Sequence, residues 1–248
     1  MKAIILAAGR GSRMGLLTKS QPKCMTTLFG KKLINWQISA LHNKHISEIG
    51  IVVGYLKKNF KFKKKYFYND NWENSNMVAS LLMADTWLKR GTSIISYSDI
   101  VYEKKIINQL VKARGDIIIT YDKNWLDLWK LRFDNPLDDA ESFRVRDGIL
   151  YDIGQKVKNV NCIEGQYMGL LKFTKNGWLK ISTFLQSLSK DTINTLDMTT
   201  LLKKLIEKKF TINCIAINGN WLEVDTESDL KIYRQKFDKQ FLKVDYNA

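Results

Sequence analysis

Apolar and polar positions alternate along this chain in blocks that predict an α/β protein. Residues 2–7 form a short apolar run, which is typical of a strand buried on both faces. Further apolar runs predict strands at 49–53, 66–68, 93–97, 116–121, 164–173, 210–217 and 221–224. Helical spacing predicts helices at 33–45, 77–88, 178–188, 198–206 and 228–241. Strands that alternate with helices predict a mixed central sheet flanked by helices.

The second half of the chain adds a hairpin to this pattern. Asp147-Gly148 stands between apolar stretches at 143–145 and 149–153, a combination that favours a tight turn. The chain has 248 residues, two prolines and no low-complexity segment. We therefore expect a single α/β domain without a hinge linker.

The loop after the first strand carries the strongest signal for chemistry. Ala7 and Ala8 lead into Gly9-Arg10-Gly11-Ser12-Arg13. Gly9 and Gly11 leave room for a phosphate and tolerate positive φ, while Arg13 and Lys23 supply positive charge. The spacing matches neither G-x-G-x-x-G nor G-x-x-x-x-G-K-[ST], and a glycine-bearing turn is common in α/β proteins. The residues alone thus leave phosphate binding and an ordinary turn both open.

Polar residues follow several other predicted strands. Gly54-Tyr55 follows the strand at 49–53, at the strand end where ligands lie in open α/β sheets. Asp99 and Asp225 each follow an apolar run, and carboxylates placed there suit Mg²⁺, although a helix N-cap is the alternative for Asp99. Asn76 and Ser80 begin a predicted helix. They serve either as part of a cap or as hydrogen-bond partners of a nucleotide base or ribose.

Composition narrows the class of protein. The apolar share of 45% and the charged share of 26% are ordinary for a globular protein, and no apolar run approaches the roughly 18 residues of a membrane span. The formal net charge of +15 suits either nucleic acid or small anions, but no nucleic-acid-binding motif accompanies the scattered lysines. Cys24, Cys162 and Cys214 form no metal or disulfide pattern. We expect a cytoplasmic protein that binds neither nucleic acid nor membrane.

Several motifs, taken in order, resemble the GT-A-like nucleotidyltransferases over essentially the full chain. The segments on which this resemblance rests are AAGRGSRM at 7–14, QPK at 21–23, VGY at 53–55, SD at 98–99 and EVD at 223–225. Within that family the chain looks most similar to the cytidylyltransferases that act on phosphocholine, phosphonates or phosphoglutamine. That likeness rests on the segments at 96–102, 125–129, 132–141, 164–170 and 219–225.

The resemblance implies a Rossmann-like, GT-A-like fold and the transfer of CMP from CTP to a small anionic acceptor, with release of pyrophosphate. It implies a nucleotide-binding part at about 1–120 and an acceptor-binding part at about 121–248, and it leaves a homodimer open. Implied catalytic residues are Lys23, Arg13, Asp99 and Asp225, with the two carboxylates holding Mg²⁺. Implied nucleotide-binding residues are Ala7, Ala8, Gly9, Gly11, Ser12, Arg13, Lys23, Gly54, Tyr55, Asn76 and Ser80. Implied acceptor-binding residues are Trp125, Trp129, Arg132, Lys156, Glu164, Gln166, Tyr167 and Trp221.

The acceptor is the least determined part of this hypothesis. Aromatic faces at 125, 129, 167 and 221 would hold an ammonium group by cation–π attraction, with acidic neighbours at 138, 139, 141 and 164, although core packing is the alternative for each tryptophan. We expect an amine-bearing phosphate or phosphonate such as phosphoglutamine, 2-aminoethylphosphonate or phosphocholine. A sugar 1-phosphate is the alternative acceptor. A non-catalytic basic binding protein with the same fold is the alternative from another class.

Overall fold

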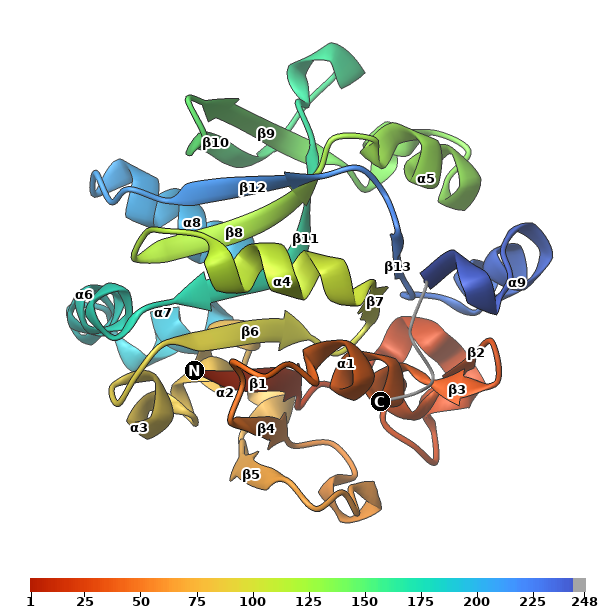
Figure 1. Cartoon of the computed structure of the whole chain (residues 1–248), viewed down its shortest axis with the longest axis horizontal. Coiled ribbons are helices and arrows are strands. Elements are labelled where there is room, and N and C mark those ends of the chain that lie inside the picture. Colours follow the sequence, from red (N-terminus) through yellow and green to blue (C-terminus); the bar gives the residue numbers. More distant parts are fainter. Residues whose placement is uncertain (243–248) are drawn as a thin grey trace.

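A nine-stranded mixed sheet forms the centre of the computed structural model, which describes residues 1–242 (Figure 1). Its strand order is β5-β4-β1-β6-β11-β8-β12-β10-β9. These strands are β1 (Lys2–Ala7), β4 (Glu48–Val53), β5 (Lys65–Tyr68), β6 (Ser93–Tyr97), β8 (Ile117–Asp122), β9 (Glu141–Arg146), β10 (Ile149–Lys156), β11 (Gln166–Phe173) and β12 (Asn213–Ile217). Two small antiparallel pairs lie beside it: β2 (Thr27–Leu28) with β3 (Lys31–Lys32), and β7 (Ile100–Tyr102) with β13 (Trp221–Glu223).

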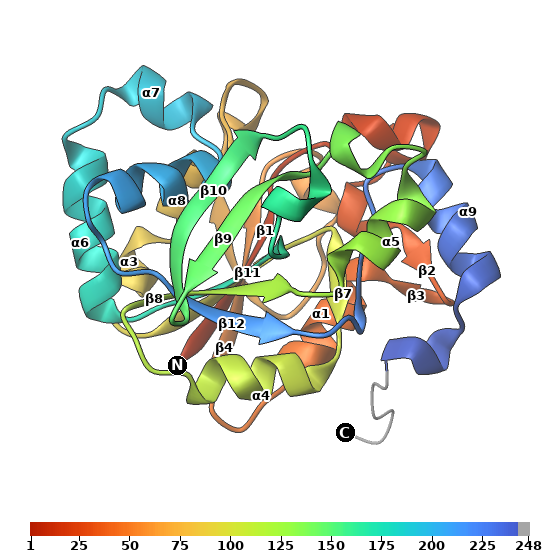
Figure 2. The same ribbon diagram turned by 90° about the horizontal axis from the view of Figure 1, so that it is seen from above.

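Helices cover both faces of the sheet and one end of it. They are α1 (Leu33–Leu41), α2 (Met77–Leu82), α3 (Asp85–Leu88), α4 (Lys104–Lys112), α5 (Trp125–Arg132), α6 (Lys175–Gln186), α7 (Lys190–Thr195), α8 (Met198–Glu207) and α9 (Glu227–Lys236). Figures 1 and 2 show α1 and α4 on one face, α3, α6, α7 and α8 on the other, and α5 and α9 at one end. The expected mixed sheet flanked by helices is confirmed. No helix within 1–242 is long and apolar enough to cross a bilayer.

Strand direction decides where a site can form. β1 runs parallel to β4 and β6, and β8 runs parallel to β12, while β11 is antiparallel to both β6 and β8. The carboxyl ends of β1, β4, β6, β8 and β12 therefore meet at one edge of the sheet. This is the edge where ligands bind in open α/β sheets.

The first strand lies in the middle of the hydrophobic core. Ile4 and Ile5 are fully buried because β1 has a strand on each side and helices on each face. Leu6 is paired with Val52 on one side and with Tyr97 on the other, so the three strands end level with one another. The loop after β1 thus begins at the same height as the loop after β6.

The strand expected before Asp225 is present as β13, but it does not belong to the main sheet. β13 pairs instead with β7, the short strand that follows Asp99. The backbone N–H of Val224 donates to the carbonyl of Asp99 at 2.9 Å, which extends the ladder by one step. This two-stranded ladder places Asp225 next to Asp99, although 126 positions separate them.

Several other elements differ from the sequence-based prediction. The helix expected at 77–88 is divided into α2 and α3. The strand expected from 210 begins only at Asn213, because α8 ends in a turn in which Lys209 has φ 62° and Phe210 N–H donates to Leu205 O. The helix α5 was not predicted, although apolar residues at 125, 128 and 129 have helical spacing. The Asp147-Gly148 hairpin is confirmed, with φ of 50° and 74°, as a type I′ turn requires.

Candidate active site

The loop after β1 packs directly against the side chain of Lys23. Gly11 has φ 72°, and a Cβ added there would lie 2.7 Å from Cβ of Lys23. Any larger residue would therefore be strained and would push the Lys23 side chain away. Gly9 lies in open space and has no positive φ, so it gives access rather than conformational freedom.

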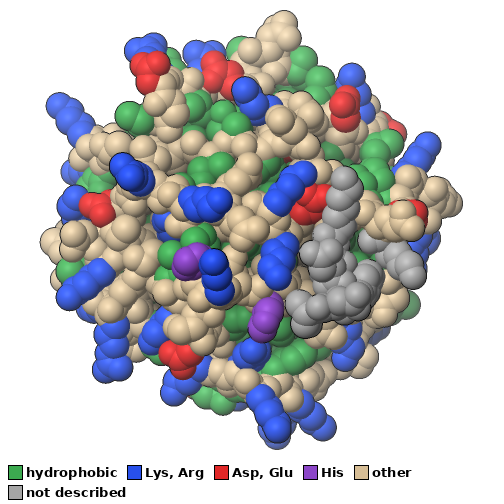
Figure 3. Space-filling model, in the orientation of Figure 1, with side chains coloured by type: hydrophobic (Ala, Val, Ile, Leu, Met, Phe, Trp, Pro, Cys, Tyr) green, Lys and Arg blue, Asp and Glu red, His purple; other side chains and the backbone are tan. Residues whose placement is uncertain are grey.

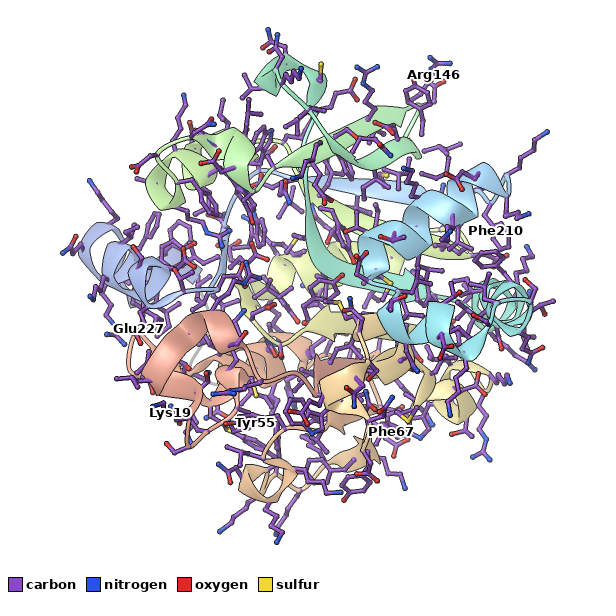
Figure 4. The ribbon with its side chains drawn as sticks, turned by 180° about the vertical axis from the view of Figure 1, so that it is seen from behind. Lys19, Tyr55, Phe67, Arg146, Phe210 and Glu227 are labelled. Atoms are coloured by element: carbon purple, nitrogen blue, oxygen red, sulfur yellow. The ribbon has the colours of Figure 1, made fainter. Side chains whose placement is uncertain are left out.

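Tyr55 and Gly54 hold this loop in place from the neighbouring strand β4. The Tyr55 hydroxyl donates to the carbonyls of Thr18 at 2.7 Å and Lys19 at 3.0 Å, and its backbone N–H donates to Ala8 O at 2.8 Å. A Cβ on Gly54 would meet both Trp72 and the Ala8 carbonyl below 3.0 Å. Neither residue lines the cavity described below, so in this structure both support the loop (Figure 4).

Lys23 lies between the two strand-end carboxylates. Its Nζ donates to Asp99 Oδ2 at 2.9 Å and to Asp225 Oδ1 at 2.6 Å, and the residue is only 7% exposed. Arg13 adds a third cationic contact, from its guanidinium to Asp225 Oδ1 at 3.1 Å, while its own side chain stays largely exposed. The loop after β1, the end of β6 and the end of β13 therefore converge on one ammonium group.

Arg132 fixes the other side of Asp225. From α5 its guanidinium donates to Asp225 Oδ2 at 3.1 Å, to Glu223 Oε2 at 2.6 Å and to Asp229 Oδ1 at 3.0 Å. Asp229 in turn accepts from the backbone N–H of Asp225 and of Thr226 at the start of α9, where it completes a capping box. The position of Asp225 is thereby set by α5, α9 and β13 together.

Burial and the charges of neighbouring groups shift the pKa values of Asp225 and Lys23 in opposite directions. Burial disfavours ionised Asp225, but Lys23, Arg13 and Arg132 outweigh it and hold its pKa below the ordinary value. Burial likewise disfavours charged Lys23, yet Asp99 and Asp225 raise its pKa. Glu223 differs: burial and the nearby Asp225 raise its pKa to about 7 in spite of Arg132. Asp225 and Lys23 are therefore both charged at neutral pH.

A cavity of about 260 Å³ opens beside these groups. Ten of the residues expected at the site line it: Ala8, Gly9, Gly11, Ser12, Arg13, Lys23, Asn76, Ser80, Asp99 and Asp225. Leu6, Trp72, Ser75, Met77, Tyr97 and Ser98 line it as well and were not predicted. Tyr97 and Ser98 immediately precede Asp99, so their position in the chain was the available signal. Ala7, also expected at the site, ends β1, is buried and does not line the cavity.

Asn76 and Ser80 have the cap-like contacts that the sequence left as one alternative. Asn76 Oδ1 accepts from the N–H of Met77 at the start of α2, and Asn76 Nδ2 donates to Thr195 O at 3.3 Å. Asn69 Nδ2 donates to the hydroxyls of Ser75 and Ser80, at 2.9 Å each. These contacts orient a polar wall of the cavity, so a capping role and a ligand-facing position occur together.

The three tryptophans expected at the acceptor do not present their faces to a ligand in this structure. Trp129 and Trp221 are each 1% exposed and Trp125 is 3% exposed, and their rings pack against one another and Phe133. Trp221 Nε1 donates to Asp122 Oδ2 at the end of β8. The tryptophan part of the aromatic cage is thus replaced by core packing, since these indoles join α5 to β13.

The other expected acceptor residues lie apart from the cavity. Lys156 is exposed at the end of β10, and Glu164 is exposed and accepts from the backbone N–H of Val145 at 2.8 Å. Gln166 pairs with Asp122 in the sheet. Tyr167 lies nearest, with its ring edge-to-face against Tyr97 at 5.9 Å between centroids. The structure therefore brings Tyr167 and Arg132 towards the site and leaves the other three away from it.

The carboxylates fit a divalent cation only together with a ligand. Within 1–242 no three His, Cys, Asp or Glu side chains are grouped to hold a metal by themselves. Asp99 Oδ1 is buried and has no hydrogen-bond partner among the described atoms, so it is available as a ligand. Two carboxylates plus phosphate oxygens form the kind of oxygen set that Mg²⁺ prefers.

On the face of the molecule seen in Figure 3, basic side chains do not gather into one stripe. Figure 3 shows lysine and arginine side chains spread over a whole face of the molecule, with acidic side chains among them. The three cysteines are free: Cys24 is buried, and Cys162 and Cys214 are half-buried.

Comparison with known proteins identifies relatives of this chain. The profile of the MobA-like NTP transferase domain matches residues 3–142. The CTP:phosphoglutamine cytidylyltransferase of Campylobacter jejuni is 38% identical, with 95% of this chain and 100% of that protein aligned. The choline-phosphate cytidylyltransferase of Streptococcus pneumoniae is 27% identical, with 84% and 97% aligned.

A solved structure supports the fold. The inositol-1-phosphate CTP transferase from T. maritima superposes with a TM-score of 0.75 over 94% of this chain and 93% of that one, at 18% identity. More than half of this chain matches the family profile, and a relative above 30% identity aligns along its whole length. The chain therefore belongs to the MobA-like NTP transferases, a family of nucleotidyltransferases.

Proposed function

We propose that this protein transfers CMP from CTP to a small phosphorylated acceptor of the phosphoglutamine class and releases pyrophosphate. The observation that carries the proposal is the convergence of Lys23, Asp99 and Asp225 beside a cavity whose other wall is the glycine-bearing loop. Cations and strand-end carboxylates in one place suit a triphosphate and its counter-ion.

The chemistry requires alignment and charge neutralisation more than proton transfer. The acceptor's phosphate oxygen is already anionic, so it can attack the α-phosphorus of CTP in line while pyrophosphate leaves. Arg13 and Lys23 would bind phosphate oxygens, and the backbone N–H groups at 9–12 would surround the chain. No general base is needed, which agrees with a cavity lining that contains no histidine.

Asp99 and Asp225 are the proposed holders of Mg²⁺. When bound, the ion would neutralise negative charge on the phosphate oxygens. Asp225 would contribute a fixed oxygen, because Arg132 and Asp229 hold its side chain and backbone. Asp99 would contribute its unpartnered Oδ1.

The choice of CTP is supported by the relatives and by the polar wall of the cavity. Both named curated relatives are cytidylyltransferases, one of phosphoglutamine and one of choline phosphate. Ser75, Asn76 and Ser80 offer hydroxyl and amide groups that can bind a base or ribose, and Asn69 orients two of them. We propose that the nucleotide-binding part is at about 1–120 and the acceptor-binding part at about 121–248. Asp225 lies in the second part of the chain but lines the proposed nucleotide cavity, so it is an exception to that division.

Three carboxylates outside the cavity lining, Asp139, Glu141 and Asp197, form what we call the acidic rim, and Asp139 is close enough to Asp225 for their charges to interact. We propose that this rim favours an acceptor that carries a cationic nitrogen. Burial raises the pKa of Asp139 and Asp225 raises it further, although the nearby Arg132 and Arg13 act in the opposite direction. The pKa of Glu141 is raised by burial and then by Asp197 and Asp139, so both of these carboxylates repel Glu141. Phosphocholine has a cationic nitrogen and phosphoglutamine has an amino group. Either group would relieve that repulsion, so the rim takes over the role first expected of the tryptophans.

The test is a pyrophosphate-release assay over four nucleoside triphosphates and a panel of acceptors. The panel contains phosphoglutamine, phosphocholine, 2-aminoethylphosphonate, glucose 1-phosphate and inositol 1-phosphate. We expect CTP with phosphoglutamine to give the highest kcat/KM and the nitrogen-free acceptors to react at least tenfold more slowly. Glu141→Gln should raise KM for the amine acceptor and leave KM for CTP unchanged.

Matched variants keep the assay interpretable. Asp99→Asn serves as the inactive control, and the exposed Lys19→Met serves as the active one. A higher kcat/KM with a sugar phosphate, or with UTP, would contradict the proposed substrates while leaving the nucleotidyltransferase family intact. Equal pyrophosphate release by wild type and Asp99→Asn would contradict the proposed catalytic site.

A further inference from the structure

A second, larger cavity lies at the opposite edge of the sheet from the candidate active site. It has a volume of about 870 Å³ and is lined by segments around the amino ends of β1, β6, β8 and β12. Thr92 borders this cavity and Ser98 borders the first one, at opposite ends of β6. With about 3.3 Å for each strand residue, the two cavities lie about 20 Å apart. Figure 4 shows Phe210, on the wall of the second cavity, far from Lys19 and Glu227 near the first.

The lining of this cavity is strongly basic. Five cationic side chains contribute to it: Arg114, Lys172, Lys180, Lys208 and Lys209. Among the described lining residues the only carboxylate is Asp116, and Lys180 already binds it at 3.0 Å. The other four cations form no ion pair with any carboxylate in 1–242. The segments are firmly apposed, since a Cβ on Gly115 would lie 2.2 Å from Asn213 Oδ1.

Lys172 is the most unusual of these cations. It is 4% exposed, on β11, and among the described residues its Nζ donates only to the carbonyls of Val111 at 3.3 Å, in the last turn of α4, and of Ala113 at 2.6 Å, the C-cap of that helix. Two acceptors leave one of its three N–H donors unused. Burial without a carboxylate partner lowers the pKa of Lys172, so an anion next to it would be stabilising.

The negative carboxyl ends of two helices offset part of this positive charge, but not most of it. α4 and α8 both end at the cavity, and each helix carboxyl terminus carries about half a negative charge. With Asp116, the local negative charge is about two, against five cationic side chains. Lys209 also keeps φ 62° at the end of α8, a conformation that favours glycine, so a cationic residue stands where glycine would be less strained.

We propose that this cavity is a second anion site, which binds the diphosphate or triphosphate chain of a phosphorylated small molecule. An excess of about three positive charges matches such a chain better than a single carboxylate. Lys172 would bind it from the floor, and Arg114, Lys208 and Lys209 from the rim. The half-buried ring of Phe210 offers an apolar surface for a nucleotide base, whereas free pyrophosphate would use the cations alone.

Isothermal titration calorimetry of the intact protein tests this site without requiring turnover. Pyrophosphate and CTP are titrated separately into wild type, into Arg114→Gln/Lys208→Gln/Lys209→Gln, and into the matched control Lys61→Gln/Lys63→Gln/Lys64→Gln. Both triple variants replace exposed residues and remove the same charge. We expect two binding sites in wild type and in the control, and at least a tenfold weaker second site in the first variant. Lys172→Met should weaken the same site, and the surface variant decides the matter if Lys172→Met does not fold.

Each outcome is decisive. A second site for both titrants identifies the phosphate chain as the ligand group, and a second site for CTP alone identifies a nucleotide. A single site in wild type would overturn the proposal. Equal weakening in the two triple variants would also overturn it, because general electrostatic attraction would then explain the binding.

Discussion

Replacement of Lys23 by methionine tests the central feature of the site. Methionine keeps an unbranched side chain and removes the charge that Asp99 and Asp225 share. Loss of one partner from a buried ion pair typically costs about 3 to 5 kcal/mol, because a charge is left uncompensated. Asp225 keeps Arg13 and Arg132, whereas Asp99 keeps no cation among the described residues. We therefore expect the lower value, about 3 kcal/mol, or a fall in Tm of about 6 to 12 °C.

A second substitution separates this charge effect from loss of packing. In Lys23→Met/Asp99→Asn the unpaired carboxylate is gone, so the double variant should regain about 1 to 2 kcal/mol relative to Lys23→Met. Its catalytic activity should not return, since the charge that binds the triphosphate is still absent. From the single to the double variant, stability should thus partly recover while activity should not.

Urea unfolding and pyrophosphate release measure the two quantities on the same preparations. We expect kcat/KM for CTP to fall at least a hundredfold in both variants, which is typical of a lost preorganised charge. Lys19→Met is the matched control, because Lys19 is an exposed lysine of the same loop. The reasoning fails if Lys23→Met unfolds at the wild-type urea concentration, or if the added Asp99→Asn lowers stability further.

Two further substitutions test other parts of the network. The pKa of Glu223 is raised to about 7 in the folded protein, so the folded state holds a proton that the unfolded chain releases at lower pH. Wild type should accordingly lose stability relative to Glu223→Gln as pH rises from about 4.5 through 7, and parallel urea midpoints across that range would contradict this. Gly11→Ala should destabilise by about 1 to 2 kcal/mol, because of its φ and its contact with Lys23, whereas Gly9→Ala should not. Equal unfolding midpoints for the two alanine variants would argue against a special role for Gly11.

The sequence predicted the parts of the fold that depend on local pattern. The strand at 2–7 and the hairpin at 147–148 follow from apolar runs and turn chemistry, and both are present. The partner of β13 could not be predicted, because a three-residue strand carries no signal for which edge it joins. The pairing of β13 with β7 depends on a long-range ladder that only the folded chain reveals.

The candidate site was predictable to the extent that its residues lie directly after strands. Asp99, Gly9 and Gly11 lie there, and sequence reasoning placed them together. Asp229 lies in a helix cap and Arg132 inside α5, where charged side chains are usually solvated, so no pattern marked them as buried partners of Asp225. The tryptophans failed for the opposite reason: an aromatic residue gives the same pattern whether its ring faces a ligand or the core.

The two carboxylates of the site are not equivalent, and the difference predicts how their variants behave. Asp225 is held by Lys23, Arg13 and Arg132 through its side chain and by Asp229 through its backbone N–H. Asp225→Asn would leave several cations facing a neutral amide, so it should lose both activity and about 3 kcal/mol of stability.

Asp99 has one ion-pair partner and one free oxygen, and its side chain is partly exposed. Asp99→Asn should therefore lose a hundredfold or more in turnover and less than about 1 kcal/mol in stability, because an amide oxygen can still accept from Lys23. The comparison needs only turnover and urea unfolding of the two asparagine variants. Equal loss of stability in both variants would contradict the argument, which rests on three cations contacting Asp225 and one contacting Asp99.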